Sequence, residues 1–108
     1  MAESQSPEAR KEFGNKLREI LGSPNVYFQP PESIKMKYPC IVYHNHGEHK
    51  RNANDKMYLF TRAYDVTVID PNPDSEIPSR LREAFPYCRY QRHFTIDNLN
   101  HETFVIYF

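Results

Sequence analysis

The chain has 108 residues, and its 14 Lys and Arg balance 14 Asp and Glu, so the formal net charge is zero. This length predicts a single domain, and the balanced charge argues against a strongly basic nucleic-acid-binding module or an acidic tail. No apolar run approaches the roughly 20 residues of a membrane span, the N-terminus lacks the apolar centre of a secretory signal, and two cysteines are too few for a disulfide scaffold. We therefore expect a protein assembled in the cytoplasm without a membrane partner.

The first predicted element is a helix that begins at Ser6-Pro7, because serine caps helix starts and proline is tolerated in the first turn. Its apolar residues recur at helical spacing on one face, and they are Phe13, Leu17, Ile20 and Leu21. Gly22 predicts the C-terminal cap. Gly14 is the weak point of this helix, since glycine inside a helix costs about 1 kcal/mol relative to alanine. Residues 1–5, ahead of the helix, are expected to be disordered.

Two short strands and a long loop follow. The first strand is Val26–Phe28, closed by Pro30-Pro31, and the second covers residues 40 to about 44. Residues 45–56 are polar and show no periodicity, so they predict a loop of a length that is usually functional or mobile. The next strand has the clearest alternation, and its apolar positions are Tyr58, Phe60, Tyr64, Val66 and Val68. Its polar residues Asp65 and Thr67 fit a solvated face.

A second helix is predicted after the Asp70-Pro71 break, with Asp74 or Ser75 as its cap. Its apolar stripe is Ile77, Leu81, Ala84 and Phe85, and Pro86 ends it. The following strand is predicted from the alternation of Cys88, Tyr90, Phe94 and Ile96, with the first three sharing an inward face. A polar turn at residues 97–100 then leads into a last strand that runs to the C-terminus.

The order of elements is therefore α-β-β-β-α-β-β within one domain, residues 1–108. This order predicts an α+β fold, in which two helices pack on one face of a mainly antiparallel sheet of four to five strands.

One group of residues suggests a metal site. His44 and His46 share one face of a strand, and His49 can fold back from the loop, so three imidazoles could hold a catalytic zinc ion. The alternative is a polar loop margin that contains several histidines. A small metal-dependent enzyme using this loop is thus one hypothesis, although no second shell or general base is evident.

Two other kinds of chemistry are disfavoured. Cys88 with His93 or His101 could form a thiol nucleophile, but the inward phase of Cys88 predicts an inert buried thiol. The three glycines lie far apart, so no phosphate-binding loop is present. An RNA-binding sheet would need an RNP-like arrangement of aromatics and glycines, which is missing.

Charge is distributed unevenly along the second half of the chain. Basic residues gather around the second helix and the strand after it, whereas acidic residues gather before the helix. We interpret the two groups as complementary subunit interfaces, made by Arg80, Arg82 and Arg89 on one subunit and by Asp70, Asp74 and Glu76 on the next. Head-to-tail contacts of this kind can close into a ring.

Three segments carry a resemblance to a known family. They are the Tyr64–Ile69 strand that runs into the Asp-Pro turn, the short helix that ends at Phe85, and the residue 97–101 turn before a terminal Tyr/Phe strand. In these patterns the chain resembles the small tail-terminator or tail-completion (head-tail joining) proteins of tailed bacteriophages, over roughly residues 13–108.

The resemblance implies a structural virion protein without enzyme activity or cofactor. Such proteins form rings, commonly hexamers, at the head-proximal end of the tail tube, where they stop tube polymerisation and join the neck or head connector. The expected partners are other copies of the chain, the tail tube protein and the neck or head connector protein. DNA is expected to pass through the lumen without specific binding. A head-closure or connector adaptor protein of the same neck region is an alternative.

Within this interpretation the polar loop is the surface that meets the tube or connector. The residues expected to make this contact are His46, His49, Lys50, Arg51, Asp55 and Lys56. Acidic and basic residues are mixed in the loop, so tight DNA binding is not expected.

Overall fold

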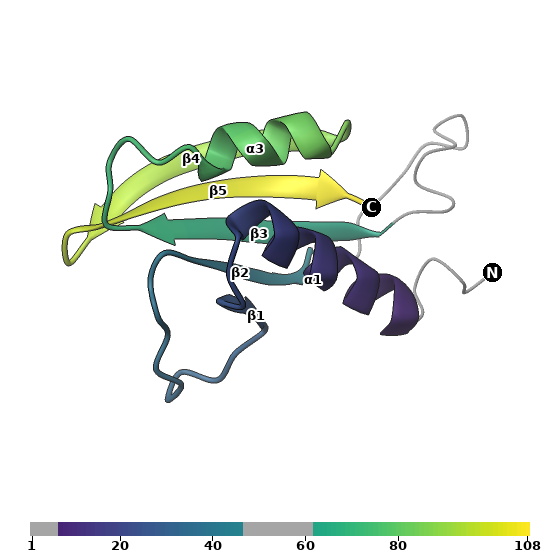
Figure 1. Ribbon diagram of the computed structural model, residues 1–108, viewed down its shortest axis with the longest axis horizontal. Helices are drawn as coiled ribbons and strands as arrows, with labels where there is room; N and C mark the ends of the chain where they lie inside the picture. The colour runs from purple at the N-terminus through teal and green to yellow at the C-terminus, as the bar shows by residue number, and fades with distance from the viewer. Residues whose placement is uncertain (1–6, 47–61) are drawn as a thin grey trace.

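A computed structural model describes residues 7–46 and 62–108 of the chain. The elements are α1 (Pro7–Leu21), β1 (Val26–Phe28), β2 (Cys40–Asn45), β3 (Ala63–Asp70), α3 (Ile77–Ala84), β4 (Cys88–Ile96) and β5 (Leu99–Tyr107). The strands form one five-stranded sheet in the order β1-β2-β3-β5-β4, and α1 and α3 lie together on one face of it (Figure 1). The predicted α+β fold, its element order and its mainly antiparallel sheet are confirmed.

Helix α1 ends as its sequence predicts. Gly22 has a positive φ of 79°, a conformation that glycine adopts without steric cost, and its N–H donates to the carbonyl of Arg18 at 2.8 Å. Phe13 and Leu17 are fully buried, so the apolar stripe faces the sheet.

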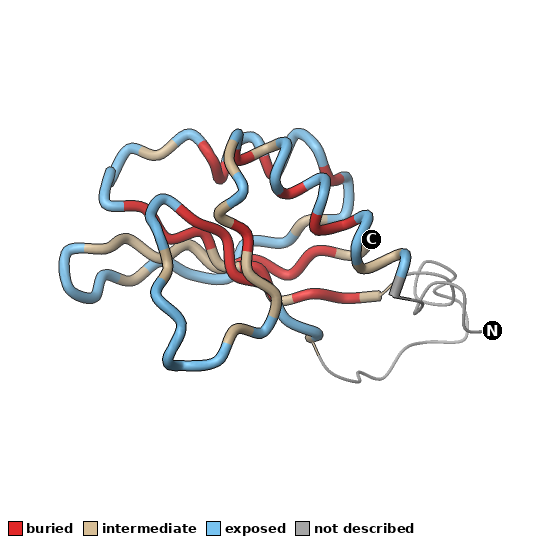
Figure 2. The backbone as a smooth tube through the Cα atoms, turned by 60° about the horizontal axis from the view of Figure 1, so that its bottom comes forward, coloured by how far each residue is buried: buried red, intermediate tan, exposed pale blue. Residues whose placement is uncertain are grey.

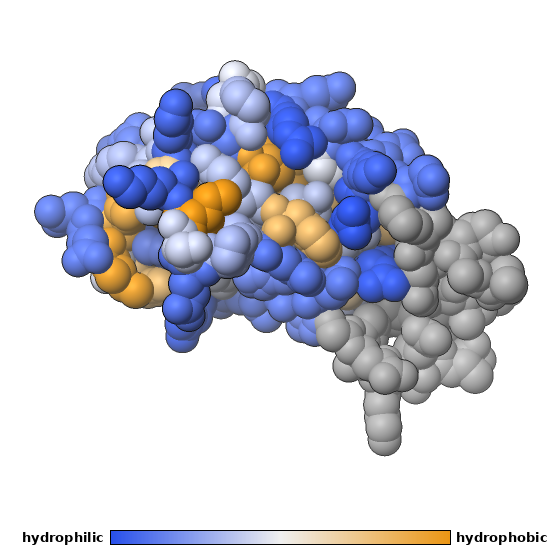
Figure 3. Space-filling model, turned by 90° about the horizontal axis from the view of Figure 1, so that it is seen from below, coloured by the Kyte–Doolittle hydropathy of each residue, from blue (hydrophilic) through white to orange (hydrophobic). Residues whose placement is uncertain are grey.

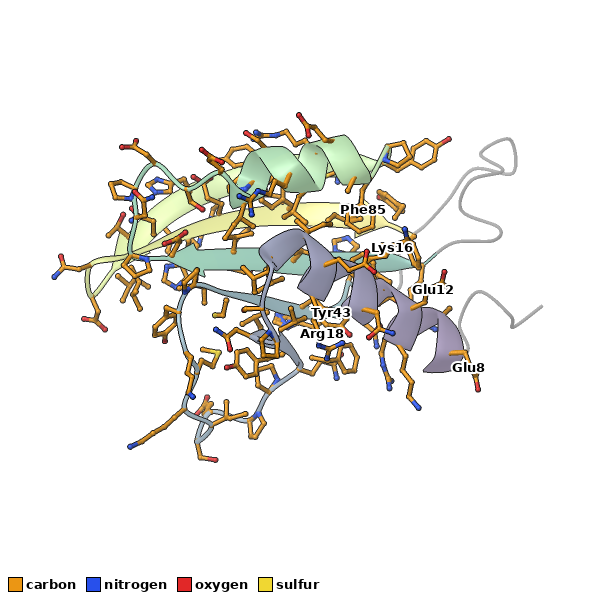
Figure 4. All side chains as sticks on the ribbon, viewed as in Figure 1. Glu8, Glu12, Lys16, Arg18, Tyr43 and Phe85 are labelled. Atoms are coloured by element: carbon orange, nitrogen blue, oxygen red, sulfur yellow. The ribbon has the colours of Figure 1, made fainter. Side chains whose placement is uncertain are left out.

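Gly14 in this helix has a packing role that the sequence analysis missed. A Cβ atom at this position would lie 2.7 Å from the hydroxyl oxygen of Tyr43 on β2. In Figure 4, Tyr43 lies against α1. The Tyr43 ring lies 5.4 Å from Phe13 and 4.9 Å from Phe28, between ring centroids. Glycine therefore allows the helix to approach the tyrosine closely.

Strand β1 forms one edge of the sheet and is short. It pairs parallel to β2 over three residues, while all the other pairs are antiparallel. Gln29, directly after it, has a φ of 43°, and Pro30 and Pro31 follow, so pairing cannot continue.

The N-cap of helix α3 lies one or two residues later than predicted. Its N-cap is Glu76, whose side chain makes no capping hydrogen bond, so the prediction of Asp74 or Ser75 as the cap is wrong. Ser75 instead accepts the N–H of Ile77 through its hydroxyl at 3.3 Å. Pro78 occupies the first turn, and Phe85 ends the helix before Pro86, as predicted. Ala84 is exposed and does not belong to the apolar stripe, which Ile77, Leu81 and Phe85 form.

The β4–β5 hairpin has a tighter turn than predicted. Only Asp97 and Asn98 form it, with φ values of 55° and 63°, because Leu99 and Asn100 already pair within β5. Two residues with positive φ are typical of a type I′ hairpin turn, which matches the twist of the strands.

Strand β4 contains an irregularity at Gln91 that changes which side chains share a face. Tyr90 pairs with Phe104, but Arg92 pairs with Thr103, so Gln91 is an extra residue on β4. Cys88 and Tyr90 therefore lie on the helix-covered face, whereas Phe94 and Ile96 lie on the opposite face. The prediction that Cys88, Tyr90 and Phe94 share one inward face is wrong, because strand periodicity shifts by one residue at a bulge.

Buried residues lie along both helices and the central strands (Figure 2). They form two apolar clusters, one on each face of the sheet. The larger one fills the space between the helices and the sheet, and its fully buried members include Phe13, Leu17, Tyr64, Val66 and Phe104. The smaller one is Cys40, Val42 and Ile69 on the other face, against Tyr27, Met36 and Leu99. We call this second, helix-free side the outer face. No helix in the described part of the chain is long and apolar enough to cross a membrane.

Candidate assembly surfaces

Two of the three histidines predicted as metal ligands, His44 and His46, lie at the end of β2 on the outer face. His46 Nδ1 is 2.8 Å from Asp65 Oδ1 on β3, and His44 is the register partner of Asp65. His49 lies outside the described residues. Among residues 7–46 and 62–108, no three His, Cys, Asp or Glu side chains are arranged to hold a metal ion. The hydrogen bond to Asp65 orients His46 within the sheet, so its position has a structural explanation.

The two cysteines are poor nucleophiles in this environment. Cys40 is fully buried, and burial raises its pKa to about 12. Burial also raises the pKa of Cys88, although the Arg82 charge opposes this effect. Since the thiolate is the reactive form, both thiols are almost entirely protonated near neutral pH.

Arg80 and Glu76, predicted on opposite sides of an interface between subunits, meet within one chain. Arg80 Nη2 lies 3.6 Å from Glu76 Oε1, one helical turn away, and Arg80 Nη1 donates to the carbonyl of Ile20 at 3.3 Å. The ion pair is exposed and weak, whereas the bond to Ile20 links α3 to the end of α1. Both side chains thus have contacts within the subunit.

Arg82 covers aromatic rings of the sheet. Its guanidinium carbon lies 5.4 Å from the ring centroid of Tyr90 and 5.6 Å from that of Phe104. Phe104 is fully buried, so the aliphatic and cationic parts of Arg82 help to close this side of the core. Arg89 lies on the outer face opposite Val105, so the structure does not bring Arg82 and Arg89 together on one surface.

The predicted acidic residues also have different environments. Asp70 is buried, and its Oδ1 accepts the N–H of Asn72 at 2.8 Å, which fixes the turn after β3. Asp74 is exposed, and only its backbone N–H is used, in a bond to Asn72 Oδ1 at 2.9 Å. Of these two carboxylates, Asp74 is therefore the one available to a partner.

Strand β4 is the other edge of the sheet and is the most exposed strand. Residues 89–93 are all exposed. The exposed fraction of Tyr90 is 42%, and that of Ile96 is 54%. Tyr87, just before the strand, is 53% exposed. Exposed aromatic and branched side chains on a sheet edge are typical of a contact surface.

Three side chains of β4 and β5 form a stack on the outer face. The Arg92 guanidinium lies 4.6 Å from the centroid of the Phe94 ring, and Phe94 stacks on His101 of β5 at 4.6 Å and 15°. The hydroxyl of Thr103 accepts the N–H of Arg92 at 3.2 Å and donates to its carbonyl at 3.3 Å, which satisfies the backbone at the bulge. Arg92 is therefore held in place on the outer face.

The sheet end formed by the β4–β5 turn is acidic. Asp97 is exposed in that turn, and the side-chain nitrogen of Asn100 donates to the carbonyls of Asp70 and Pro71 at 3.1 and 3.3 Å. These bonds hold the 70–76 connection beside the turn, and Figure 1 shows both at the same end of the molecule. We call Asp74 and Asp97 the acidic end.

The side that carries the 29–39 connection offers no continuous apolar surface. Figure 3 shows hydrophilic residues over most of it, with separate hydrophobic patches in the middle and towards the hairpin end. Tyr27 on β1 uses its hydroxyl to accept the N–H of Lys37 from this connection at 3.1 Å. The two edges of the sheet thus differ, since Tyr27 of β1 contacts the connection that follows it, whereas no other described strand pairs with the outer side of β4.

Most of the predicted loop contacts lie outside the described residues, namely His49, Lys50, Arg51, Asp55 and Lys56. The sequence predicted Asp97 in a polar turn but indicated neither its part in an acidic surface nor the Arg92–Phe94–His101 stack. The absence of Lys and Arg after Arg92 is a sequence signal that could have pointed to Asp97. No local signal marks the bulge at Gln91.

No protein-family model, curated protein or solved structure matches this chain.

Proposed function

We propose that this chain is a structural virion protein that forms a ring at the head-proximal end of a phage tail. The ring ends the tail tube and joins it to the neck or head connector. This proposal rests on the resemblance of the strand, turn and helix patterns to tail-terminator proteins, together with the exposed surfaces of the folded chain. The subunit performs no bond-breaking step in this role.

The observation that carries the proposal is the open edge at β4. Nine residues lie along it, no other strand of residues 7–46 and 62–108 pairs with its outer side, and Tyr90 and Ile96 remain about half exposed. An unpaired edge with apolar side chains tends to associate, so a stable protein must protect or cover it. The bulge at Gln91 and the arginines protect it in the free subunit, and association with a neighbour covers it in a ring.

The interior of the subunit supports a structural role in a second way. The pKa of Cys40 is raised to about 12 and that of Cys88 is raised by burial, so neither thiol is activated. His46 is held by Asp65 at 2.8 Å. These groups stabilise or orient parts of the sheet instead of converging on a reaction centre.

The partners follow from the proposed position. One surface of the ring meets the tail tube protein and another meets the neck or head connector protein, and the 45–56 segment is the proposed contact with one of them. DNA passes through the lumen without specific binding, and the protein resides at the tail-neck junction of the virion.

Assembly in solution tests this proposal. Light scattering after size-exclusion chromatography, with and without tail tubes, should detect a ring-sized species, or a monomer that becomes a ring on the tube end. Electron microscopy should then show capped tubes of uniform length. A chain that stays monomeric and leaves tube length unchanged would contradict the proposal.

The same assay distinguishes a tail terminator from the alternative, a head-closure or connector adaptor protein. A head-closure or connector adaptor protein would bind the connector in the absence of tail tubes, whereas a terminator binds tubes in the absence of the connector. Metal analysis of the purified protein separates the enzyme hypothesis. One equivalent of zinc that is lost in His44→Ala would favour a metal site at His44, His46 and His49.

A further inference from the structure

Two arginines on β4 form a basic strip on the outer face. Arg89 lies opposite Val105 and Arg92 opposite Thr103, and the extra residue Gln91 places both arginines on this face. Within the described residues, neither guanidinium has a carboxylate at ion-pair distance. Arg80, by contrast, already pairs with Glu76 of its own chain. Arg82 lies over the Tyr90 ring on the helix-covered face, whereas Arg92 lies over the Phe94 ring on the outer face.

The acidic end has the opposite charge and is equally available. Asp74 and Asp97 are exposed, and neither carboxylate forms an ion pair with a described residue. Residues 63–79 and 93–108, which supply this end, contain no Lys or Arg. From residue 63 to the last residue, Lys and Arg are thus confined to residues 80–92.

The strip and the acidic end are too far apart to neutralise each other within one subunit. A strand rises about 3.3 Å per residue, so Arg92 and Arg89 lie about 16 and 26 Å from Asp97 along the strand. Both distances exceed the Debye length of about 8 Å at physiological ionic strength. Only a second molecule can bring these charges into contact.

We propose that the basic strip of one subunit, Arg89 and Arg92, binds the acidic end of the next copy, Asp74 and Asp97. This inference rests on the proposed ring function and names the surfaces that close the ring. Because the two surfaces are different, the contact is head-to-tail, which is the type that generates rings. The contact is made by side chains, since the bulge and the arginines on β4 oppose continuous pairing with another strand.

Two variants each remove one surface. Arg89→Glu with Arg92→Glu reverses the strip. Asp74→Lys with Asp97→Asn removes the acidic end, and asparagine is chosen at position 97 because it tolerates the positive φ of 55° there. Each variant should raise the concentration for half-maximal assembly at least about tenfold, because opposed like charges strongly disfavour an interface.

An equimolar mixture of the two variants gives the most specific test. Two contacts can form in the mixture, because the intact acidic end of the arginine variant meets the intact strip of the aspartate variant, and the reversed strip meets the lysine-bearing end. Light scattering should therefore detect ring-sized assemblies in the mixture, at concentrations where each variant alone does not assemble. The chain carrying all four substitutions should regain assembly, since its strip is acidic and its other end basic.

A matched control separates this site from net charge. Lys11→Glu with Lys16→Glu changes the net charge as much as the arginine reversal does, on exposed positions of α1. It should assemble like the unmodified chain, and circular dichroism should show that all variants are folded. Equal loss of assembly in the control would overturn the proposal.

Other outcomes distinguish this inference from the proposed function. If the unmodified chain forms rings and the arginine reversal forms them equally well, the interface is wrong while the ring function stands. If that variant forms rings but no longer caps tubes, the strip binds the tube and the inference also fails. If the unmodified chain forms no ring with or without tubes, the proposed function fails first.

Discussion

Strands β3 and β4 flank β5 and pair with it in the same antiparallel manner, but their environments differ. Six of the eight residues of β3 are buried, whereas no residue of β4 is fully buried. Strand β3 has β2 on its other side, while β4 is the last strand of the sheet that the described residues form. An alternating pattern therefore predicts a strand, but its place in the sheet decides whether its side chains stabilise the fold or remain for a partner.

The largest effect is expected for Phe13, which packs on the β3 side of the molecule. Its ring stacks on Tyr64 with centroids 4.5 Å apart and lies 5.3 Å from that of Phe85. Phe13→Ala should lower the free energy of unfolding by about 3–5 kcal/mol, because it leaves a cavity in a packed aromatic cluster. Urea unfolding measures this loss. A loss below about 2 kcal/mol would mean that the core closes around the missing ring.

The second effect concerns the pH dependence of stability through Cys40. Its pKa is raised from 9.0 to about 12 in the folded chain, so the folded state holds this proton where the unfolded state has lost it. The contribution of this thiol to the free energy of unfolding is complete below pH 9. It is lost as pH rises towards 12, with a slope that approaches about 1.4 kcal/mol per pH unit. The difference in unfolding free energy between the unmodified chain and Cys40→Ala, measured from pH 8 to 10.5, isolates this group from the tyrosines. A difference that does not change with pH would contradict the prediction.

The third effect tests the close approach of α1 to β2. Gly14→Ala should lower the free energy of unfolding by about 1 kcal/mol, since the overlap with the Tyr43 hydroxyl outweighs the better helix propensity of alanine. In a Tyr43→Phe background the hydroxyl is absent, and the same substitution should stabilise the chain by up to about 1 kcal/mol. Thermal or urea unfolding of the four chains measures this coupling. If the two substitutions change the free energy of unfolding additively, an added Cβ at position 14 does not clash with the Tyr43 hydroxyl.

The smallest effect is expected on β4. Ile96→Thr should change the free energy of unfolding by no more than about 0.5 kcal/mol, because the side chain is 54% exposed. The matched change on β3 is Val66→Thr, where burying a hydroxyl should cost about 1–3 kcal/mol. Equal losses at the two positions, measured by urea unfolding, would remove the contrast between the strands.

Much of the fold could be predicted because its signals are local. The helical spacing of Phe13 and Leu17, the Gly22 cap and the proline breaks each act over a few residues, and they predicted the type and order of the elements. The cap of α3 was predicted wrongly because Ser75 uses its hydroxyl in a local turn just before the helix. Asp74, Ser75 and Glu76 are consecutive polar residues that could each be the N-cap, and only the backbone conformation shows which one is.

The candidate surfaces were less predictable, since they depend on contacts between distant segments. Arg80 and Glu76 form a pair within the chain, and Arg82 reaches rings on β4 and β5. The carboxylate of Asp70 accepts a hydrogen bond within its own turn. Charge along the sequence indicated the general partition of basic and acidic residues, but it could not identify which of them remain exposed without a partner.

Sequence alone determined the α+β class, the seven elements and their order, because periodicity and the Gly and Pro breaks fix local conformation. The tertiary structure alone decided that β4 is an edge strand and that Gln91 shifts its phase, so that Arg89 and Arg92 share a face. Those features arise from the register between β4 and β5, and register is a property of two segments that no single stretch of sequence contains.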